Sequence, residues 1–182
     1  MHSSFNDAHL VSLAKAGEIE AFGELYSRYL DPIYRYIRTR VNEDQTAEDL
    51  TEETFIRAFK ALDKYEERGL PFSAYLYRVT KNLLVDMYRK QKEEIALDKA
   101  DHIPAPVIDM DESLIRAEKH SMLGQAYKQL STDYQEIIRL RIILGISTSE
   151  AASWMERSEG ATRVLLHRAL KALREQMMND GS

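Results

Sequence analysis

Apolar residues recur every three or four positions through most of this chain, which places them on one face of an α-helix. Helices are predicted over residues 7–40, as two helices broken near Gly17, then over 46–64, 72–91, 114–130 and 132–144, with a final helical pair in 147–174. Pro32 lies inside the second helix, where it predicts a kink or a restart. The three-residue spacing of Thr132 and Gln135 predicts a capping box. The pattern indicates an all-α protein.

The helical spacing stops between residues 93 and 113, where the chain reads EEIALDKADHIPAPVIDMDES. This segment is acidic and carries Pro104 and Pro106, a composition typical of a flexible linker. It is expected to join two small helical domains, at residues 1–92 and 114–182. The simplest interpretation of the linker is a solvated tether. The alternative is an acidic strand that follows a basic groove of a partner.

The final helical pair is the most informative stretch of the sequence. Ser147 and Glu150 have the spacing of a capping box, and Gly145 suits the end of the helix before them. After a short interruption, Ser158 is placed to cap the second helix. A short capped helix, a tight turn and a longer helix are typical of a helix-turn-helix that binds DNA.

The second helix of this pair has an apolar face and a basic face. The apolar face carries Thr162, Leu165, Leu166, Ala169 and Leu173, and the basic face carries Arg163, His167, Lys171 and Arg174, with Arg168 at its edge. An apolar side anchors a DNA-reading helix on its domain, while the basic side neutralises phosphates and reaches base edges. An ordinary amphipathic helix shows the same division, so the capped helix and turn before it are what favour DNA.

Two earlier stretches carry charge of opposite sign. Residues 43–69 contain nine acidic and four basic residues, whereas residues 70–92 contain one acidic and five basic residues. The expected buried positions of the first stretch are Leu50, Phe55, Phe59 and Leu62. In the second, basic residues alternate with tyrosines, which suits single-stranded nucleic acid because rings stack on bases and cations follow the backbone. A solvated face and core tyrosines are the alternatives.

The sequence contains no constellation typical of catalysis. Its five histidines are scattered without metal-ligand spacing, it has no cysteine, and no glycine-rich nucleotide loop is present. The N-terminal residues lack the charged and apolar blocks of a signal peptide, and no apolar run approaches the length of a membrane span. We therefore expect a cytoplasmic protein that is not an enzyme, holds no cofactor or metal, and does not insert into a membrane.

Two segments resemble parts of a known family. The stretch AEDLTEETFIRAFKAL at 47–62 resembles the polymerase-binding helix of bacterial sigma factors, and FSAYLYRVTKNLLVDMYRKQ at 72–91 resembles their promoter-melting helix. Together with the 147–174 pair, they resemble the extracytoplasmic-function (ECF) group of the sigma-70 family, which keeps only regions two and four. The resemblance implies a region 2 domain at 1–92, a region 4 domain at 114–182, and a transcription initiation factor that directs core RNA polymerase to promoters.

The resemblance also implies roles for individual residues. Asp49, Glu52, Glu53 and Phe55 would lie in or beside the surface that meets core polymerase. The loop at 65–72 would hold a flipped base of the non-template strand, and the minus-ten contacts would come from Tyr65, Phe72, Tyr75, Arg78, Lys81, Asn82 and Arg89. The minus-thirty-five element would meet Ser158, Glu159, Gly160, Ala161, Thr162, Arg163, His167, Arg168 and Lys171. The linker would run near the RNA exit channel.

Four positions of the helix-turn-helix depart from the family pattern. Glu156 stands where the turn often carries glycine, Glu159 where proline is common, Thr162 where an aliphatic residue packs, and Leu165 where arginine is frequent. These changes are compatible with the fold and with weaker minus-thirty-five binding. The partners implied are core RNA polymerase and promoter DNA, both duplex and single-stranded. Many members of the family are also held by an anti-sigma factor.

Three other functions remain open from the sequence. A helix-turn-helix regulator acting without polymerase would need no aromatic and basic helix at 72–91, and it would usually dimerise to read paired half-sites. In a helical adaptor or scaffold, neutralising Arg163 and Arg168 would change nothing except solubility. An enzyme is the most distant alternative.

Overall fold

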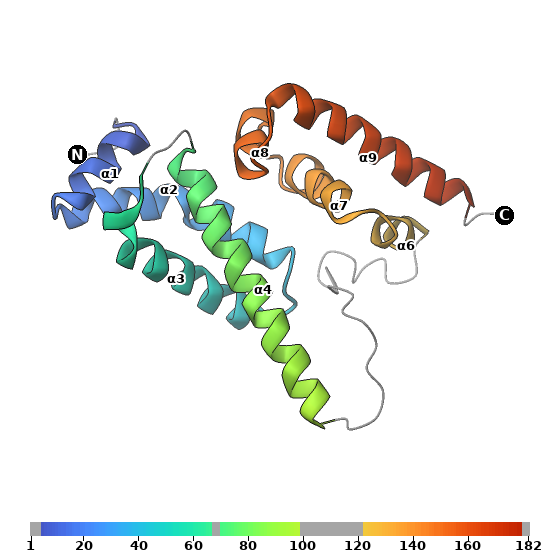
Figure 1. The fold of residues 1–182 in the computed structure, drawn as a ribbon, viewed down its shortest axis with the longest axis horizontal. Coiled ribbons are helices and arrows are strands. Elements are labelled where there is room, and N and C mark those ends of the chain that lie inside the picture. The colour runs from blue at the N-terminus through green and yellow to red at the C-terminus, as the bar shows by residue number, and fades with distance from the viewer. Residues whose placement is uncertain (1–4, 67–69, 99–121, 180–182) are drawn as a thin grey trace.

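The computed structural model describes residues 5–66, 70–98 and 122–179, and these residues form helices joined by turns (Figure 1). The N-terminal half contains α1 (Asp7–Lys15), α2 (Ile19–Arg38), α3 (Asp44–Lys60), a short 3-10 turn η1 (Leu62–Lys64) and α4 (Phe72–Asp98). The C-terminal half contains α6 (Met122–Lys128), α7 (Thr132–Ile138), the π-helical turn η3 (Arg139–Ile143), α8 (Thr148–Trp154) and α9 (Glu159–Asn179). The expected all-α architecture is confirmed in the described residues.

Local signals set the helix boundaries of the N-terminal half. The Asn6 side chain caps α1 by accepting a hydrogen bond from the His9 amide at 2.9 Å. Gly17 adopts φ +99°, and this left-handed residue separates α1 from α2 as expected. The second helix continues through Pro32. Helix α4 extends to Asp98, into the stretch expected to be linker, and the rest of that stretch lies outside the described residues.

The start of α7 corrects one sequence prediction. Ser131, rather than Thr132, is the N-cap residue of α7, and its side chain makes no capping hydrogen bond. Gln135 is buried, and its amide donates to the Leu130 carbonyl at 2.9 Å and the Lys128 carbonyl at 3.2 Å. The expected capping box is wrong because this amide instead satisfies carbonyl groups at the end of α6.

The capping box at α8 is confirmed. The Glu150 amide donates to the Ser147 hydroxyl at 3.2 Å, and the Glu150 carboxylate accepts from the Ser147 amide at 3.3 Å. Gly145, at φ +68°, precedes this box. In the turn between α8 and α9, Glu156 adopts φ +54°, a left-handed conformation that favours glycine. Ser158 accepts from the Ala161 amide at 3.1 Å and so caps α9.

Replacing Ser147 by alanine is expected to destabilise the C-terminal half by about 1 kcal/mol, because α8 loses its reciprocal cap. Urea denaturation followed by circular dichroism measures the loss. Ser149→Ala is the matched control, since this exposed serine lies inside the same helix. Equal stability of the two variants would contradict the role of the cap.

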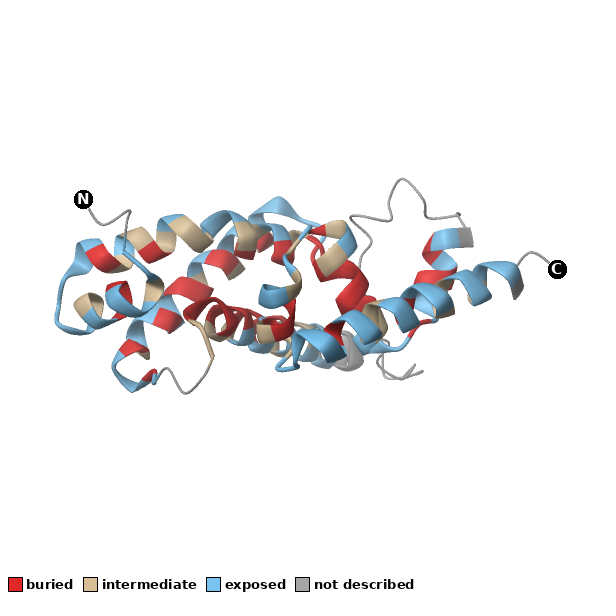
Figure 2. Cartoon of the chain, turned by 90° about the horizontal axis from the view of Figure 1, so that it is seen from above, coloured by how far each residue is buried: buried red, intermediate tan, exposed pale blue. Residues whose placement is uncertain are grey.

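Buried residues line the faces where helices meet, and the outward faces are exposed (Figure 2). The N-terminal core includes Leu25, Ile33 and Leu76, and the C-terminal core includes Ile137 and Leu140. The buried rings of Tyr36, Tyr77 and Trp154 connect the two groups into one cluster. Within the described residues, no helix has the length and apolar character needed to cross a membrane.

Candidate nucleic-acid interface

The division of α9 into two faces is confirmed. Thr162 and Ala169 are buried, Leu165, Leu166 and Leu173 are half-buried, and the predicted basic residues Arg163, His167, Arg168, Lys171 and Arg174 are all exposed. Ser158, Glu159, Gly160 and Ala161 are exposed at the N-terminal end of the helix. In a recognition helix, this N-terminal end is the part that approaches bases.

Two residues at this end of α9 are engaged within the helix. The Arg163 guanidinium lies 2.7 Å from the Glu159 carboxylate, and both side chains are largely exposed. An exposed pair of this kind contributes little to stability, so it leaves Arg163 able to exchange Glu159 for a phosphate or base. Thr162 needs a correction as a DNA contact: its side chain is 1% exposed and its hydroxyl donates to the Ser158 carbonyl at 2.9 Å.

The basic residues predicted on α4 share an exposed surface. Arg78, Lys81, Asn82 and Arg89 are all exposed. The Lys81 ammonium lies 6.0 Å from the centre of the Tyr77 ring, and Arg89 approaches Asp86 at 3.4 Å. The Tyr77 ring is 3% exposed, so the cations of this face, rather than this ring, are open to a nucleic-acid backbone.

A small cavity of about 270 Å³ lies at the N-terminal end of α4. Its lining residues are Lys64, Tyr65, Glu66, Leu70, Tyr75 and Arg78. The Tyr65 hydroxyl donates to the Leu70 carbonyl at 3.0 Å, which fixes one side of the cavity. Residues 67–69 of the expected base-binding loop lie outside the described residues.

Two of the aromatic residues predicted to contact DNA are buried instead. Phe72 is 1% exposed and Tyr65 is 8% exposed. Phe72 packs against Tyr65 and Tyr75, with ring centres 5.8 Å and 5.9 Å apart. Phe72 is therefore a support beneath the other two rings rather than a contact, and half-buried Tyr75 is the aromatic face most accessible to a base.

The charged face of α3 also carries apolar residues that the sequence pattern missed. Asp49 and Glu52 are exposed, and Glu53 pairs with Arg57 at 2.7 Å. Ile56 and Phe59 are 45% and 48% exposed, so the expected burial of Phe59 is wrong. Among the aromatic contacts between described residues, the Phe59 ring makes one, an edge-on contact with Phe22, with ring centres 4.9 Å apart.

The Phe55 side chain lies in the core rather than on that surface. Its side chain is 3% exposed, and its ring packs edge-on against Tyr26 at 4.7 Å. Because Phe55 is enclosed while Ile56 and Phe59 are about half exposed, the accessible apolar contacts are Ile56 and Phe59. This corrects the expectation that Phe55 meets a partner directly.

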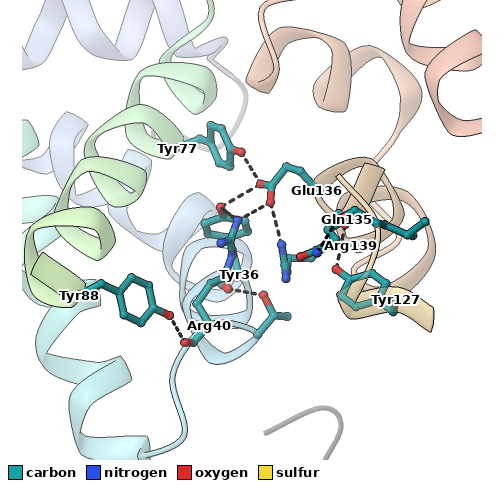
Figure 3. Close-up of polar contacts among 10 residues, drawn as sticks. Tyr36, Arg40, Tyr77, Tyr88, Tyr127, Gln135, Glu136 and Arg139 are labelled. Carbon is teal, nitrogen blue, oxygen red and sulfur yellow. Dashed lines mark hydrogen bonds and ion pairs between the residues drawn. The ribbon is translucent and has the colours of Figure 1, made fainter. Parts of the chain in front are cut away.

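A buried ionic cluster joins the two halves (Figure 3). Glu136 of α7, 4% exposed, accepts hydrogen bonds from the hydroxyls of Tyr36 at 2.9 Å and of Tyr77. It also pairs with the guanidinium of Arg40, across the interface, and with that of Arg139 at 2.8 Å in its own half. Sequence reasoning missed this cluster, although Glu136 and Arg139 flank the apolar residues Ile137 and Ile138.

The electrostatic environment keeps Glu136 ionised. Burial by itself raises the pKa of a carboxyl, but Arg40 and Arg139 outweigh it and hold the pKa of Glu136 below its usual range. Hydrogen bonds from Tyr77 and Tyr36 act in the same direction. Burial and the same carboxylate raise the pKa of both tyrosines, so they remain neutral donors at neutral pH.

Two further contacts lie beside the ionic cluster. The Trp154 ring of α8 stacks on Tyr77 of α4, with centres 4.9 Å apart and planes inclined by 24°. Glu156, in the turn after α8, pairs with Arg78 of α4 at 2.5 Å. Arg78 thus belongs to three features at once: the basic face of α4, the cavity lining and the contact between the halves.

The comparisons with known proteins cover both halves. The family model for sigma-70 region 2 matches residues 25–94, and that for sigma-70 region 4 matches residues 120–173. The ECF RNA polymerase sigma factor BldN of Streptomyces coelicolor is 34% identical over 173 residues, which cover 94% of this chain and 66% of BldN. The chain therefore spans just under two thirds of the length of that relative.

Two solved structures resemble this fold. CnrH, in complex with the cytosolic domain of CnrY, aligns with a TM-score of 0.64 and 27% identity over 96% of this chain and 98% of CnrH. The sigma factor RpoE from Bartonella quintana, in complex with the anti-sigma factor NepR, aligns with a TM-score of 0.56 and 23% identity over 86% of this chain and 96% of RpoE. The second likeness concerns the fold alone.

Proposed function

The chain belongs to the ECF group of the sigma-70 family, and from this membership we propose that it binds core RNA polymerase and directs it to two-part promoters. One observation carries the proposal: region 2 and region 4 occur in this order on one chain, and each presents an exposed basic helix face, on α4 and on α9. A helix-turn-helix regulator acting without polymerase would leave the region 2 half without a role.

Each half has its own task in this proposal. The region 2 domain, at 1–92, meets core polymerase through α3 and the minus-ten element through α4. Arg78, Lys81, Asn82 and Arg89 follow the phosphates of the opened strand, and the cavity beside Tyr75 receives an unstacked base. The region 4 domain, at 114–182, reads the minus-thirty-five element with the N-terminal end of α9. The residues at 93–113 link the two domains.

The protein performs no covalent chemistry in this mechanism. It captures unstacked bases as the duplex opens, and the free energy of that binding favours the open promoter. It works beside polymerase in the cytoplasm. An anti-sigma factor is the third partner that we propose, because the family resemblance implies one and CnrH, which is 27% identical to this chain, was solved in complex with the cytosolic domain of CnrY.

Transcription in vitro tests the proposed function. The protein is mixed with bacterial core polymerase and a pool of promoter-containing DNA, and RNA start sites are mapped. Starts that depend on the added protein are expected, and their upstream sequences would define both promoter elements. If the protein neither binds core polymerase nor produces starts, the proposal is rejected and a regulator acting without polymerase takes its place.

A double substitution of Asp49→Ala with Glu53→Ala is expected to weaken assembly with core polymerase about tenfold, because α3 loses two carboxylates that face a basic partner. Titration of labelled core polymerase measures the change, and promoter recognition by any holoenzyme that forms should persist. Glu18→Ala with Glu20→Ala is the matched control, removing the same charge from exposed positions around the start of α2. Undiminished assembly would remove these two carboxylates from the interface.

A further inference from the structure

Helix α1 lies beside the part of region 2 that forms the base cavity (Figure 1). It packs against α2 and also contacts η1 and α4. The match to sigma-70 region 2 begins at residue 25, so it does not include α1. Polar contacts near the two ends of this helix, at Asp7 and Lys15, connect it to the residues that line or support the cavity.

At the C-terminal end of α1, Lys15 holds the turn that forms one wall of the cavity. Its ammonium donates a hydrogen bond to the carbonyl of Tyr65, 50 residues further along the chain. The Tyr65 amide donates to the carbonyls of Ala61 at 3.1 Å and Leu62 at 3.0 Å. The Tyr65 hydroxyl donates to the Leu70 carbonyl at 3.0 Å. Lys15 therefore completes a set of hydrogen bonds that fixes this residue by its amide, its carbonyl and its side chain.

The N-terminal end of α1 supports the same cavity through packed rings. The Asp7 carboxylate accepts a hydrogen bond from the hydroxyl of Tyr29 on α2. Burial and this carboxylate raise the pKa of Tyr29, so its hydroxyl remains a neutral donor at neutral pH. The Tyr29 ring lies 6.1 Å from the centre of Phe72. Phe72 in turn packs beneath Tyr65 and Tyr75, which line the cavity.

The Lys15 contact has the properties of a brace rather than of a core contact. Lys15 is exposed on the last turn of α1, so its removal leaves the hydrophobic core intact. A charged donor makes a stronger hydrogen bond to a carbonyl than a neutral donor does. A site that discriminates between ligands needs walls held within about 0.5 Å of the productive geometry. The wall at Tyr65 obtains part of that restraint from Lys15.

We propose that Lys15 is a positioning residue for base recognition, which holds Tyr65 in place so that the cavity discriminates among unstacked bases. The inference rests on the proposed function, because it takes this cavity to receive a base of the minus-ten element. Lys15 acts through the Tyr65 backbone and does not itself contact the base. Without its hydrogen bond, the wall moves more freely and the cavity accepts other bases more readily.

Four substitutions separate this role from general effects of charge or folding. Lys15→Met removes the ammonium but keeps an unbranched side chain with a similar helix propensity. Lys15→Arg retains a charged donor that can reach the same carbonyl. Arg35→Met is the control, since it removes the same charge from an exposed site on α2, where the partner Asp31 lies on the same helix at 3.9 Å. Tyr75→Ala removes the accessible ring of the cavity and so identifies the promoter position that the cavity reads.

The first measurement is hydrogen exchange of the Tyr65 amide in the free full-length chain, followed by nuclear magnetic resonance. Exchange should be about fivefold faster in Lys15→Met, the effect of losing one hydrogen bond beside this amide. Lys15→Arg and Arg35→Met should exchange at the parent rate, and all three variants should unfold thermally as the parent does. An unchanged exchange rate in Lys15→Met would overturn the proposal.

The second measurement uses holoenzyme and forked promoter probes that carry each of the four bases at each minus-ten position. At the position where Tyr75→Ala abolishes discrimination, Lys15→Met should reduce the preference for the best base about fivefold. Lys15→Arg should restore that preference, and Arg35→Met should leave it unaltered. Unchanged discrimination in Lys15→Met, an equal loss at every position, or a Lys15→Arg chain that behaves like Lys15→Met would overturn the positioning role.

The same titrations, repeated over a range of salt concentrations, distinguish positioning from a direct phosphate contact. Positioning leaves the salt dependence of Lys15→Met at the parent value. A phosphate contact by Lys15 would lower it by about one unit and weaken all sequences alike, a result that would also overturn the proposal. Failure of the proposed function is separate: it appears as absent core binding and absent start sites with the parent chain.

Discussion

Phe59→Ala is expected to weaken assembly with core RNA polymerase by about 30-fold, or roughly 2 kcal/mol, the effect of losing an aromatic anchor at the centre of an interface. The ring is 48% exposed on α3, beside Ile56 and among the carboxylates of the same face. A half-exposed aromatic ring that lies within a charged face is the arrangement in which a partner gains most by covering it.

Because the Phe59 ring is already half exposed, its removal should destabilise the free chain by less than it weakens binding. Thermal unfolding separates the two effects, and surface plasmon resonance against immobilised core polymerase measures the affinity. Ile19→Ala is the control, since Ile19 is 72% exposed at the start of α2, outside the proposed surface. Equal affinities of the two variants for core polymerase would exclude Phe59 from the interface.

Arg163→Ala is the second substitution with a large expected effect: promoter affinity of the holoenzyme should fall about 10- to 100-fold, with core binding unchanged. Arg163 lies on the first turn of α9, where a recognition helix reaches base edges, and one arginine that contacts a base contributes about 1–3 kcal/mol. Its exposed pair with Glu159 does not prevent this exchange.

Filter binding of a mapped promoter, repeated over a range of salt concentrations, also shows which contact Arg163 makes. A phosphate contact would lower the salt dependence by about one unit and weaken all sequences alike, whereas a base contact would relax selectivity at one position. Arg35→Ala, with the same charge change at an exposed site on α2, should leave promoter affinity unaltered. A holoenzyme that lost nothing with Arg163→Ala would remove this helix end from the recognition surface.

Local sequence signals predicted the helices well, because caps and periodicity act over a few residues. Ser147 with Glu150 fixed the start of α8, and Gly17 marked the break between the first two helices. The capping prediction at Thr132 was wrong because a long side chain such as Gln135 has several acceptors within reach. The family membership was also predictable, because three stretches in a set order, 47–62, 72–91 and 147–174, carried it.

Burial at the edges of a helical stripe was less predictable. Periodicity assigns Phe55 and Phe59 to similar faces of α3, four residues apart, yet one ring is enclosed and the other is half exposed. The ionic cluster at Glu136 could not be predicted either, because its partners Arg40 and Tyr36 lie 96 and 100 residues away along the chain. The local signal was the placement of Glu136 and Arg139 around apolar residues.

A single base change in the codon of Glu156 can replace this residue by glycine. Its left-handed backbone costs an L-residue about 1–2 kcal/mol relative to the right-handed form, and glycine avoids most of that cost. The glutamate codons GAA and GAG become glycine codons by changing one base. Random mutagenesis therefore reaches the less strained turn in a single step. We expect such a library, screened for thermal stability, to recover glycine at this position and, with it, chains in which Arg78 has lost its ion pair with Glu156.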